Sequence, residues 1–298
     1  MTIVNTALLA LAALFWGVSG GIGGMLIADG WDPYVVSFYR GAIGLLFVLV
    51  WLILRPRGSG FANRRLWFWS AVAGVGVAGN FSLYFFSISK VGVSVAAPLM
   101  YCAPVFVYLL SFGFKIESPT RLKWAAIGVV IVGIVLLTRV YEVDVSGITP
   151  IGIGAGLLAG LCYAVFIFGF KFAARQGSPQ AILVIAFAVL VCLLIWPADI
   201  NQIVAVLSTP DWPLFMSLGV LGAGLSFILY IVGLYYTVPT VASIVAMIEP
   251  VAASLFGVLI LNENLIALQI LGMALILVAV TTLSVYSSGG RPVYNLTS

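Results

Sequence analysis

The stretch Met247–Glu263, MIEPVAASLFGVLILNE, is apolar apart from Glu249, which directly precedes Pro250, and from its polar end. A similar stretch, Tyr101–Glu117 (YCAPVFVYLLSFGFKIE), lies 146 residues earlier. It also ends in a glutamate, and its Pro104 stands at the position of Pro250. Similarity at a fixed spacing indicates an internal duplication. We therefore expect two related halves with the functional site between them.

The composition places the chain in a lipid bilayer. Of its 298 residues, 63% are hydrophobic and 7% are charged, and the mean hydropathy is +1.23. A soluble domain carries about 25% charged residues. The apolar runs are continuous and approach the ~20 residues of a spanning helix, whereas the strands of a membrane barrel alternate polar and apolar residues. The sequence predicts an all-α membrane protein.

Charged residues, glycine, proline and asparagine separate ten apolar runs. The runs cover residues 4–28, 33–54, 66–89, 93–114, 121–138, 150–171, 179–197, 212–236, 240–260 and 265–286. With the N-terminus in the cytoplasm, ten of the 13 Lys and Arg residues fall in cytoplasmic segments, two fall on the opposite side, and Arg40 lies within a run. This distribution follows the positive-inside rule and predicts that both termini are cytoplasmic.

The runs form two units of five, which we place at residues 1–145 and 146–286, followed by a polar tail at 287–298. Because five is odd, the second unit enters the membrane from the opposite side. We therefore predict ten transmembrane helices as two inverted five-helix repeats around a central cavity. Secondary transporters recurrently have this design, with the site near the middle of the membrane between the repeats.

Small, polar and aromatic residues form one face of the third run, at steps of three or four, and similar residues follow in the eighth run. They are Gly76, Asn80, Tyr84 and Ser87, and Gly222, Ser226, Tyr230 and Gly233. Such a face either lines a cavity or packs closely against another helix, and both alternatives stay open.

Proline interrupts the fourth and ninth runs at matching positions, Pro104 and Pro250. Each proline removes a helical hydrogen bond, so each is a candidate hinge or a static kink. Polar and aromatic residues share a face beside each proline. They are Tyr101 and Tyr108 in the fourth run, and Thr240, Ser243, Met247 and Ser254 in the ninth.

The first run carries Trp16 and five glycines between residues 17 and 24, and the sixth run carries four aromatic residues. These are Tyr163, Phe166, Phe168 and Phe170. The glycines can form a GxxxG packing face and the aromatic residues can face lipid. A thin glycine face opposite aromatic side chains would also form a pocket for a flat apolar ligand.

Two charged residues, Arg40 and Glu249, lie within runs, and the residues at their repeat positions are uncharged. Charge inside a membrane costs at least about 2.5–3.5 kcal/mol and indicates a functional candidate. Glu249 lies about 200° around the helix from Met247, so the two cannot face one cavity squarely. We favour a structural role for Glu249 at the Pro250 break. Arg40 can pair with Glu249, with backbone carbonyls, or with a substrate carboxylate.

Several sequence features of enzymes are absent. The chain has no GxxxxGK[ST] sequence and no histidine, which excludes a P-loop, a Ser–His pair and an HExxH metal site. The three cysteines lie in apolar runs and are expected to pack in the core. We expect no catalytic residue, no metal, no cofactor and no nucleic-acid partner. An intramembrane enzyme or a receptor-like scaffold is the alternative of another class.

The ninth and tenth runs resemble the second-half signature of the EamA family, a branch of the drug/metabolite transporter superfamily. The matching residues are Ile248 to Val251, Leu255 to Leu261, Asn262-Glu263, Gln269, Gly272 and Ile276, with Asn262 in place of the usual glycine. The first half matches less closely, through Pro104 to Phe106 and Glu117, and Ala103 stands where an acid would strengthen the match. The resemblance covers the whole chain.

Within that family, the chain resembles the bacterial aromatic amino-acid exporters of the YddG type. The resemblance implies an inner-membrane exporter of aromatic and other neutral amino acids that works by alternating access. The ten spans can form a functional monomer. Proton-coupled efflux of hydrophobic cations or drugs through Glu249 is the alternative function.

The expected substrate is a small molecule, an amino acid with an aromatic or apolar side chain. We expect the side chain to stack on aromatic residues, and Asn80, Ser226 and Ser243, with Met247 beside them, to contact its polar ends. The aromatic residues are Trp16, Tyr84, Tyr101, Tyr163 and Tyr230.

Overall fold

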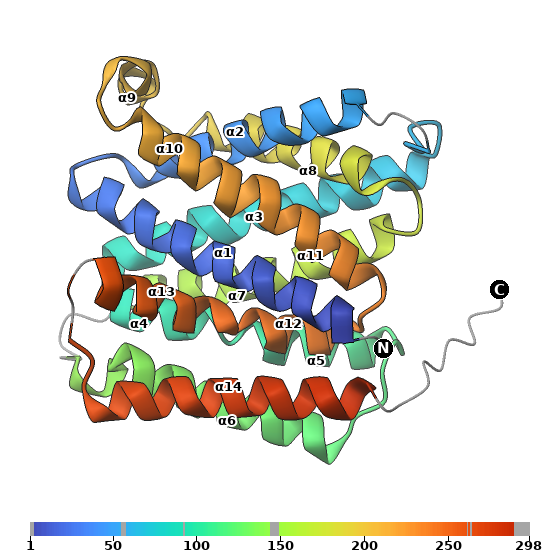
Figure 1. The fold of residues 1–298 in the computed structure, drawn as a ribbon, viewed down its shortest axis with the longest axis vertical. Helices are drawn as coiled ribbons and strands as arrows, with labels where there is room; N and C mark the ends of the chain where they lie inside the picture. Colours follow the sequence, from blue (N-terminus) through green and yellow to red (C-terminus); the bar gives the residue numbers. More distant parts are fainter. Residues whose placement is uncertain are drawn as a thin grey trace.

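The structure is a computed structural model that describes residues 3–54, 58–91, 93–143, 149–260, 262 and 264–288. Throughout these residues the chain is helical, with no strand (Figure 1). The first half contains α1 (Ile3–Ala28), α2 (Pro33–Leu54), α3 (Arg64–Val91), α4 (Val93–Met100), α5 (Ala103–Gly113) and α6 (Arg121–Thr138). The second half contains α7 (Pro150–Ala173), α8 (Pro179–Leu194), α9 (Ile200–Ala205), α10 (Trp212–Gly219), a π-helical turn η4 (Val220–Leu225), α11 (Ser226–Tyr235), α12 (Pro239–Ala246), α13 (Ile248–Ile260) and α14 (Ala267–Ser288).

Eight helical segments among the described residues are long and apolar enough to cross a membrane, so the protein is a multi-pass membrane protein. Three of the eight combine two or more elements: α4 with α5, α10 with η4 and α11, and α12 with α13. The seventh and tenth predicted spans correspond to shorter apolar helices, Pro179–Leu194 and Ala267–Leu283. With 16 residues, α8 is about 24 Å long at 1.5 Å per residue, less than the ~30 Å hydrocarbon core. The count of ten spans therefore stays a prediction.

Several helices begin with a side-chain cap. Thr120, Thr149 and Ser178 accept hydrogen bonds from the first turns of α6, α7 and α8. Pro150 and Pro179 occupy the first turn of α7 and α8, where a missing N–H costs nothing. These caps explain why the predicted and observed starts of these helices agree closely.

Successive spans run in opposite directions, so that the first turn of α1 and the last turn of α14 lie at the same end of the bundle (Figure 1). At each end of the bundle, a side-chain hydrogen bond joins connecting segments of the two halves. At the end shared by α1 and α14, the Asn63 amide donates to the Gln176 side chain at 2.8 Å. At the opposite end, the Trp31 indole donates to Asp211 at 3.0 Å. We call these the basic end and the acidic end, after the charges described next.

Charge is sorted between the two ends. The basic end carries Arg64, Arg65, Lys115, Arg121, Lys123, Lys171 and Arg175, with Glu117. The acidic end carries Asp29, Asp32, Glu142, Asp199 and Asp211, with Lys90 and Arg139. The other charged residues of the predicted distribution, Arg55, Arg57, Asp144, Glu263 and Arg291, lie outside the described residues, as does the predicted tail beyond Ser288.

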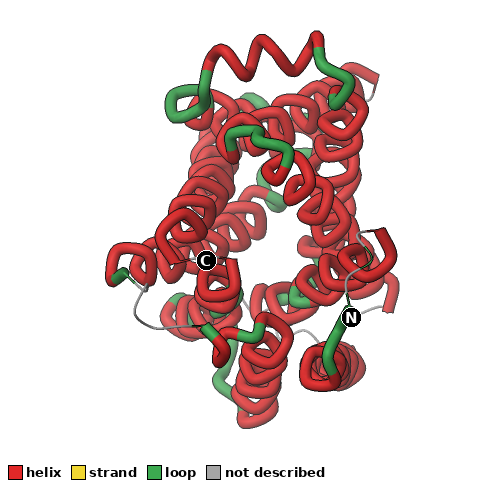
Figure 2. The backbone as a smooth tube through the Cα atoms, turned by 90° about the vertical axis from the view of Figure 1, so that its left-hand side faces the viewer, coloured by secondary structure: helices red, strands yellow, loops and turns green. Residues whose placement is uncertain are grey.

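Helices of the two halves pack against one another in matching pairs. α3 lies along α7, and the α10–η4–α11 span lies along α1. α1 also packs on α12 and α13, as α7 packs on α4 and α5. α6 and α14 pair at one side of the bundle, and α9 lies across the other helices at the acidic end (Figures 1 and 2). The core therefore combines residues of both halves.

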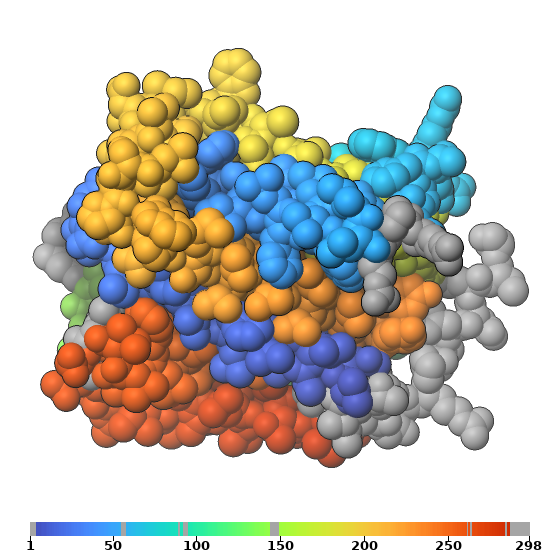
Figure 3. Space-filling view, turned by 45° about the horizontal axis from the view of Figure 1, so that its top comes forward, coloured from blue at the N-terminus to red at the C-terminus, as the bar shows by residue number. Residues whose placement is uncertain are grey.

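The outer surface is apolar, as a lipid-facing surface must be. On α2, which lies on the face seen in Figure 3, Leu46, Val50 and Ile53 are 63%, 57% and 74% exposed. An apolar surface of this kind is rare on a soluble monomer. The exposed residues therefore support the membrane location that the composition predicts.

Three spans are interrupted near the middle of the bundle. The α4–α5 span breaks at Tyr101 and Cys102, and the α12–α13 span breaks at Met247, 146 residues after Tyr101. Pro104 and Pro250 lie in the first turn after each break. The eighth span contains the π-helical turn η4. Discontinuous helices of this kind often surround transporter binding sites, and π-turns cluster at functional sites.

Candidate functional site

A cavity of about 300 Å³ lies inside the bundle, between the two halves. Helices α1, α2, α3 and α4 of the first half line it, together with α7, α10, α11 and α13 of the second. It extends from Trp16 and Tyr163, at mid-helix, to Ile27 and Ile88 near the acidic end. Its volume is at the lower end of the range for small-molecule sites.

Aromatic rings form the inner wall of the cavity. Trp16 lies 5.1 Å from Phe227 and 6.4 Å from Phe166, between ring centroids, and Phe166 lies 4.5 Å from Tyr163. Tyr230 packs behind Trp16, with its centroid 4.8 Å away, and is fully buried. These rings separate the cavity from the basic end, so a ligand entering from the acidic end would meet a flat apolar wall.

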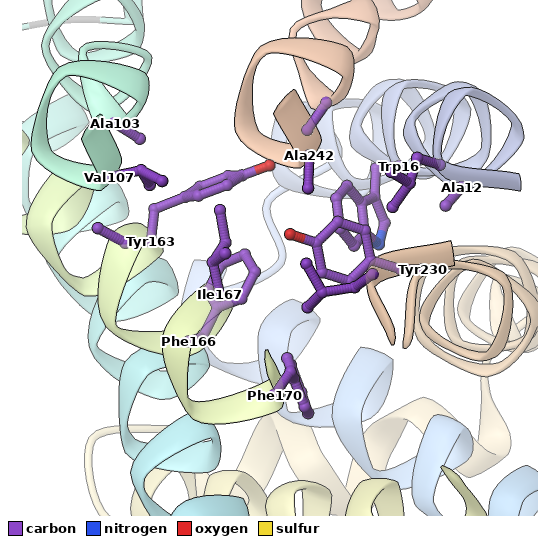
Figure 4. Close-up of a cluster of buried hydrophobic side chains, with 14 of the residues drawn as sticks. Ala12, Trp16, Ala103, Val107, Tyr163, Phe166, Ile167, Phe170, Tyr230 and Ala242 are labelled. Carbon is purple, nitrogen blue, oxygen red and sulfur yellow. The ribbon is translucent and has the colours of Figure 1, made fainter. Parts of the chain in front are cut away.

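Polar atoms on these rings have unused hydrogen-bonding capacity. Among the described residues, the Trp16 indole nitrogen and the hydroxyls of Tyr163 and Tyr230 are buried without a partner. Figure 4 shows the two hydroxyls directed toward the same interior space. Buried polar groups without a partner are uncommon, so these atoms indicate a place for water or for a polar ligand group.

The glycines of α1 divide between the two alternatives that the sequence left open. A Cβ at Gly20 or Gly24 would meet no atom within 4 Å, and both residues line the cavity. A Cβ at Gly17 would lie 2.5 Å from the Glu249 carbonyl oxygen, and one at Gly21 would overlap the Phe256 ring. Part of the glycine face therefore opens the cavity, and part packs α1 against α13.

The aromatic residues of α7 do not face lipid. Phe166, Phe168 and Phe170 are buried, with at most 4% of their surface exposed. Phe166 also lines the cavity. Because α3, α4, α5 and α11 surround α7, the lipid-facing alternative is excluded for these three residues.

The polar face of α3 is mostly a packing surface. Gly76 lies against the backbone of Phe166, and Ser87 donates to the Gly152 carbonyl at 2.7 Å. The Asn80 amide donates to the Ala159 carbonyl at 3.0 Å, although Asn80 also lines the cavity. Tyr84 lines it directly. Close approach to α7 thus explains most of this face.

The predicted substrate-binding residues fall into two groups. Trp16, Asn80, Tyr84, Tyr101 and Tyr163 line the cavity. Ser226, Tyr230, Ser243 and Met247 are fully buried on the side toward the basic end. The π-turn lies just before Ser226. The Ser243 hydroxyl donates to the Thr240 carbonyl at 2.8 Å. Their role in binding stays a prediction.

Both membrane charges lie in the cavity wall. The Arg40 guanidinium donates from Nε and Nη2 to the Gly222 carbonyl, at 3.1 and 3.0 Å. Glu249 lies in the first turn of α13 and is hydrogen-bonded to the Tyr101 side chain. Met247, two residues earlier, is fully buried away from the cavity. Arg40 therefore uses a backbone carbonyl rather than the Glu249 carboxylate.

Sequence reasoning missed several apolar residues of the wall. They are Phe81, Phe85, Ile88, Met100, Leu218 and Phe227. Three of them follow one another along α3 at steps of four and three, next to Tyr84. This helical spacing places them on the same face as Tyr84 and could have identified them. The sequence analysis searched for polar residues and therefore did not include them.

Two buried charges close the basic end. The Lys171 ammonium donates to the carbonyls of Leu234, Tyr235 and Thr237 at 2.8, 2.8 and 2.6 Å. On the other side of the same link, the Glu117 carboxylate accepts from the backbone N–H of Thr240 at 3.1 Å.

Glu117 is held in turn by the Lys123 ammonium at 2.6 Å and by the Ser111 hydroxyl at 3.1 Å. A cation thus sits at the C-terminus of α11 and an anion at the N-terminus of α12, as the helix dipoles favour.

Within the described chain, no group of three or more His, Cys, Asp or Glu side chains is arranged to hold a metal ion. The polar groups of the cavity are hydroxyls, an amide, an indole, one guanidinium and one carboxylate. This set suits the binding of an organic ligand by hydrogen bonds and charge.

Known proteins resemble this chain over most of its length. An uncharacterized transporter of Archaeoglobus fulgidus is 30% identical over 84% of this chain and 86% of its own length. The threonine/homoserine exporter RhtA of Escherichia coli K12 is 26% identical, over 86% and 85% respectively. A crystal structure with 16% identity superimposes with a TM-score of 0.76 over 98% of this chain and 99% of that chain, which shows the fold alone.

The model of the EamA-like transporter family matches the chain twice, at residues 5–139 and 150–285. Each match spans one of the two halves that surround the cavity. The protein is a membrane transporter and belongs to the EamA-like transporter family.

Proposed function

We propose that this protein exports amino acids with aromatic or other neutral side chains across the bacterial inner membrane by alternating access. The observation that carries the proposal is a cavity between the two family repeats whose inner wall consists of Trp16, Tyr163, Phe166 and Phe227. Flat rings with unused polar atoms suit a ligand that is apolar at one end and polar at the other.

The arrangement of the helices supports the inverted-repeat topology. Corresponding spans of the two halves run in opposite directions in Figure 1, and their packing partners correspond. The charge sorting supports a cytoplasmic basic end and cytoplasmic termini. In this orientation the cavity extends toward the outside and the Lys171 contacts close the cytoplasmic side, which is one of the two states that alternating access requires.

A second candidate substrate is a small hydroxylated amino acid such as threonine. Relatives named threonine/homoserine exporters cover most of the chain. The unpartnered Tyr163 hydroxyl at the inner wall would bind a substrate hydroxyl. The aromatic wall favours a larger side chain, so we place phenylalanine first and threonine second.

Proton-coupled efflux of hydrophobic cations is the alternative. The Glu249 carboxylate in the cavity favours it, but the Arg40 guanidinium in the same cavity opposes the binding of a cation. We therefore rank this function below amino-acid export.

Counterflow in proteoliposomes tests the proposal. Vesicles are preloaded with unlabelled phenylalanine or threonine, and a trace of the labelled amino acid is added outside without an ion gradient. We expect transient accumulation of label that tryptophan competes for and glutamate does not. If only a labelled organic cation accumulates, and only under a pH gradient, the amino-acid proposal is wrong.

A further inference from the structure

Arg40 and Glu249 bring opposite charges to one small cavity inside the membrane. Arg40 comes from α2 and Glu249 from α13, so each half contributes one charge. Their repeat positions hold Ala186 and Ala103, so the duplication does not explain either charge. Charges at this depth are costly to keep, and a function is the usual reason for keeping them.

The Arg40 guanidinium is held firmly but is incompletely used. Two of its N–H groups point to one acceptor, the Gly222 carbonyl, and its plane lies over the Phe81 ring at 4.7 Å. A guanidinium has five N–H donors, and among the described residues no acceptor meets the other three. Arg40 is thus fixed in position with donors to spare.

The Glu249 carboxylate is held in a similar way. It is hydrogen-bonded to Tyr101 and lies at the N-terminus of α13, where the helix dipole favours a negative charge. Tyr84 and Tyr163 line the same cavity as Glu249. A carboxylate has about four acceptor sites, so it can accept further donors.

The two charges do not satisfy each other. Arg40 and Glu249 interact electrostatically, yet, among the described residues, the N–O contacts within 4.0 Å are those of Lys123 with Glu117 and Arg139 with Glu142. Arg40 is anchored to the Gly222 carbonyl and Glu249 to the Tyr101 side chain, and both charged residues line the same cavity. A ligand with both signs of charge would complete both sites at once.

We propose that Arg40 and Glu249 select a zwitterion: Arg40 binds the α-carboxylate and Glu249 binds the α-ammonium of the transported amino acid. The inference rests on the proposed function and names the residues that set its substrate class. Because a low-dielectric cavity strengthens charge interactions and penalises an unmatched charge, ligands with one charge leave one site uncompensated. The aromatic wall then holds the side chain.

The test compares phenylalanine with two analogues that each lack one charge. Phenethylamine lacks the carboxylate and 3-phenylpropanoate lacks the amine. Binding to purified protein is measured by calorimetry at pH 7 for the wild type, Arg40→Gln and Glu249→Gln. The wild type should prefer phenylalanine over each analogue by roughly 10- to 100-fold, the contribution of hydrogen bonds to a charged group.

Each variant should lose one preference and keep the other. Arg40→Gln should reduce the preference over phenethylamine to about threefold or less and retain the preference over 3-phenylpropanoate. Glu249→Gln should do the reverse. Lys90→Gln and Glu142→Gln remove the same charges from exposed positions at the acidic end and should preserve both preferences. Arg40→Lys and Glu249→Asp keep the charge and should retain partial preferences if the glutamine variants do not fold.

The outcomes separate this inference from the proposed function. If phenylalanine binds but each variant lowers the affinity for all three ligands equally, Arg40 and Glu249 do not select the zwitterion, and the proposed function stands. If neither phenylalanine nor threonine binds to the wild type, both fail. A wild type that prefers phenethylamine overturns the zwitterion site and moves the function to cation efflux.

Discussion

Substituting Lys171 with methionine should open the basic end of the transporter. The ammonium group donates to three backbone carbonyls at the link between α11 and α12, and only 4% of the residue is exposed. Methionine has a similar length and no donor, so the carbonyls of Tyr235 and Thr237 lose their donor, whereas the Leu234 carbonyl keeps the Thr237 N–H at 3.1 Å. The carbonyls can form new bonds only when the link moves and admits water.

The size of the effect follows from the two carbonyls that lose their only donor. A buried acceptor that loses its partner costs about 1–3 kcal/mol, so even the lowest value gives about 2 kcal/mol for the two carbonyls left without a donor. An energy of that size changes an equilibrium constant by roughly thirtyfold. The closed state of the basic end loses this stabilisation, whereas the open state already lacks the bonds. The ratio of open to closed molecules should therefore rise by roughly thirtyfold or more.

Cysteine labelling in oriented vesicles measures this ratio. The three native cysteines are replaced by serine, and a single reporter is introduced as Ser243→Cys, which is fully buried toward the basic end, or as Gly24→Cys, which faces the cavity. With Lys171→Met, an impermeant maleimide should label the first reporter much faster from the basic side. The second reporter should become slower to label from the acidic side.

The control variant is Lys115→Met, which removes an exposed cation from the same end and should change neither rate. Two results would refute the reasoning. A change below about threefold at Ser243→Cys would show that the three bonds do not hold the end closed. Faster labelling of both reporters would show loss of folding rather than exchange between two states.

Other substitutions test the site. Gly222→Ala would place a methyl group 2.7 Å from the Arg40 Nε, so counterflow should fall at least tenfold, with about 1–3 kcal/mol lost from overpacking and a lower melting temperature. Gly20→Ala should leave the melting temperature unchanged because the site is open, whereas Gly17→Ala should lower it because its Cβ would meet α13 at 2.5 Å. Tyr163→Phe removes a buried hydroxyl without a partner, so thermal stability should be kept or should rise, while a drop in ligand affinity would show that the substrate uses this hydroxyl.

The sequence predicted features that depend on local patterns. Continuous apolar runs gave the helices, and the caps Thr149 and Ser178 gave their starts. Pro104 and Pro250, at matching positions of the repeat, indicated the two interrupted spans. Proline removes a backbone hydrogen bond whatever the neighbours of the helix are. These features need no knowledge of which helices are neighbours.

Features that depend on neighbours were beyond the sequence. The contact between Arg40 and Gly222 joins residues 182 positions apart, and its acceptor lies in the π-turn. The face of Gly76 and Ser87 was compatible with a cavity or with packing, and only the position of α7 decides for packing. Glu249 is the opposite case, since the angle between Glu249 and Met247 already indicated that only one of them faces the cavity.

The inverted repeat gives the open and closed ends a common geometry. At the basic end, the last turn of α7 bonds through Lys171 to the link between α11 and α12. The corresponding parts at the acidic end are the last turn of α1 and the end of α3, where Ile27 and Ile88 instead face the cavity. Exchanging the two arrangements would close the acidic end and open the basic end.

The repeat position of Lys171, 146 residues earlier, is Met25, which cannot donate to carbonyls. Closure of the acidic end would therefore depend on packing alone, and the empty transporter should favour the state closed at the basic end.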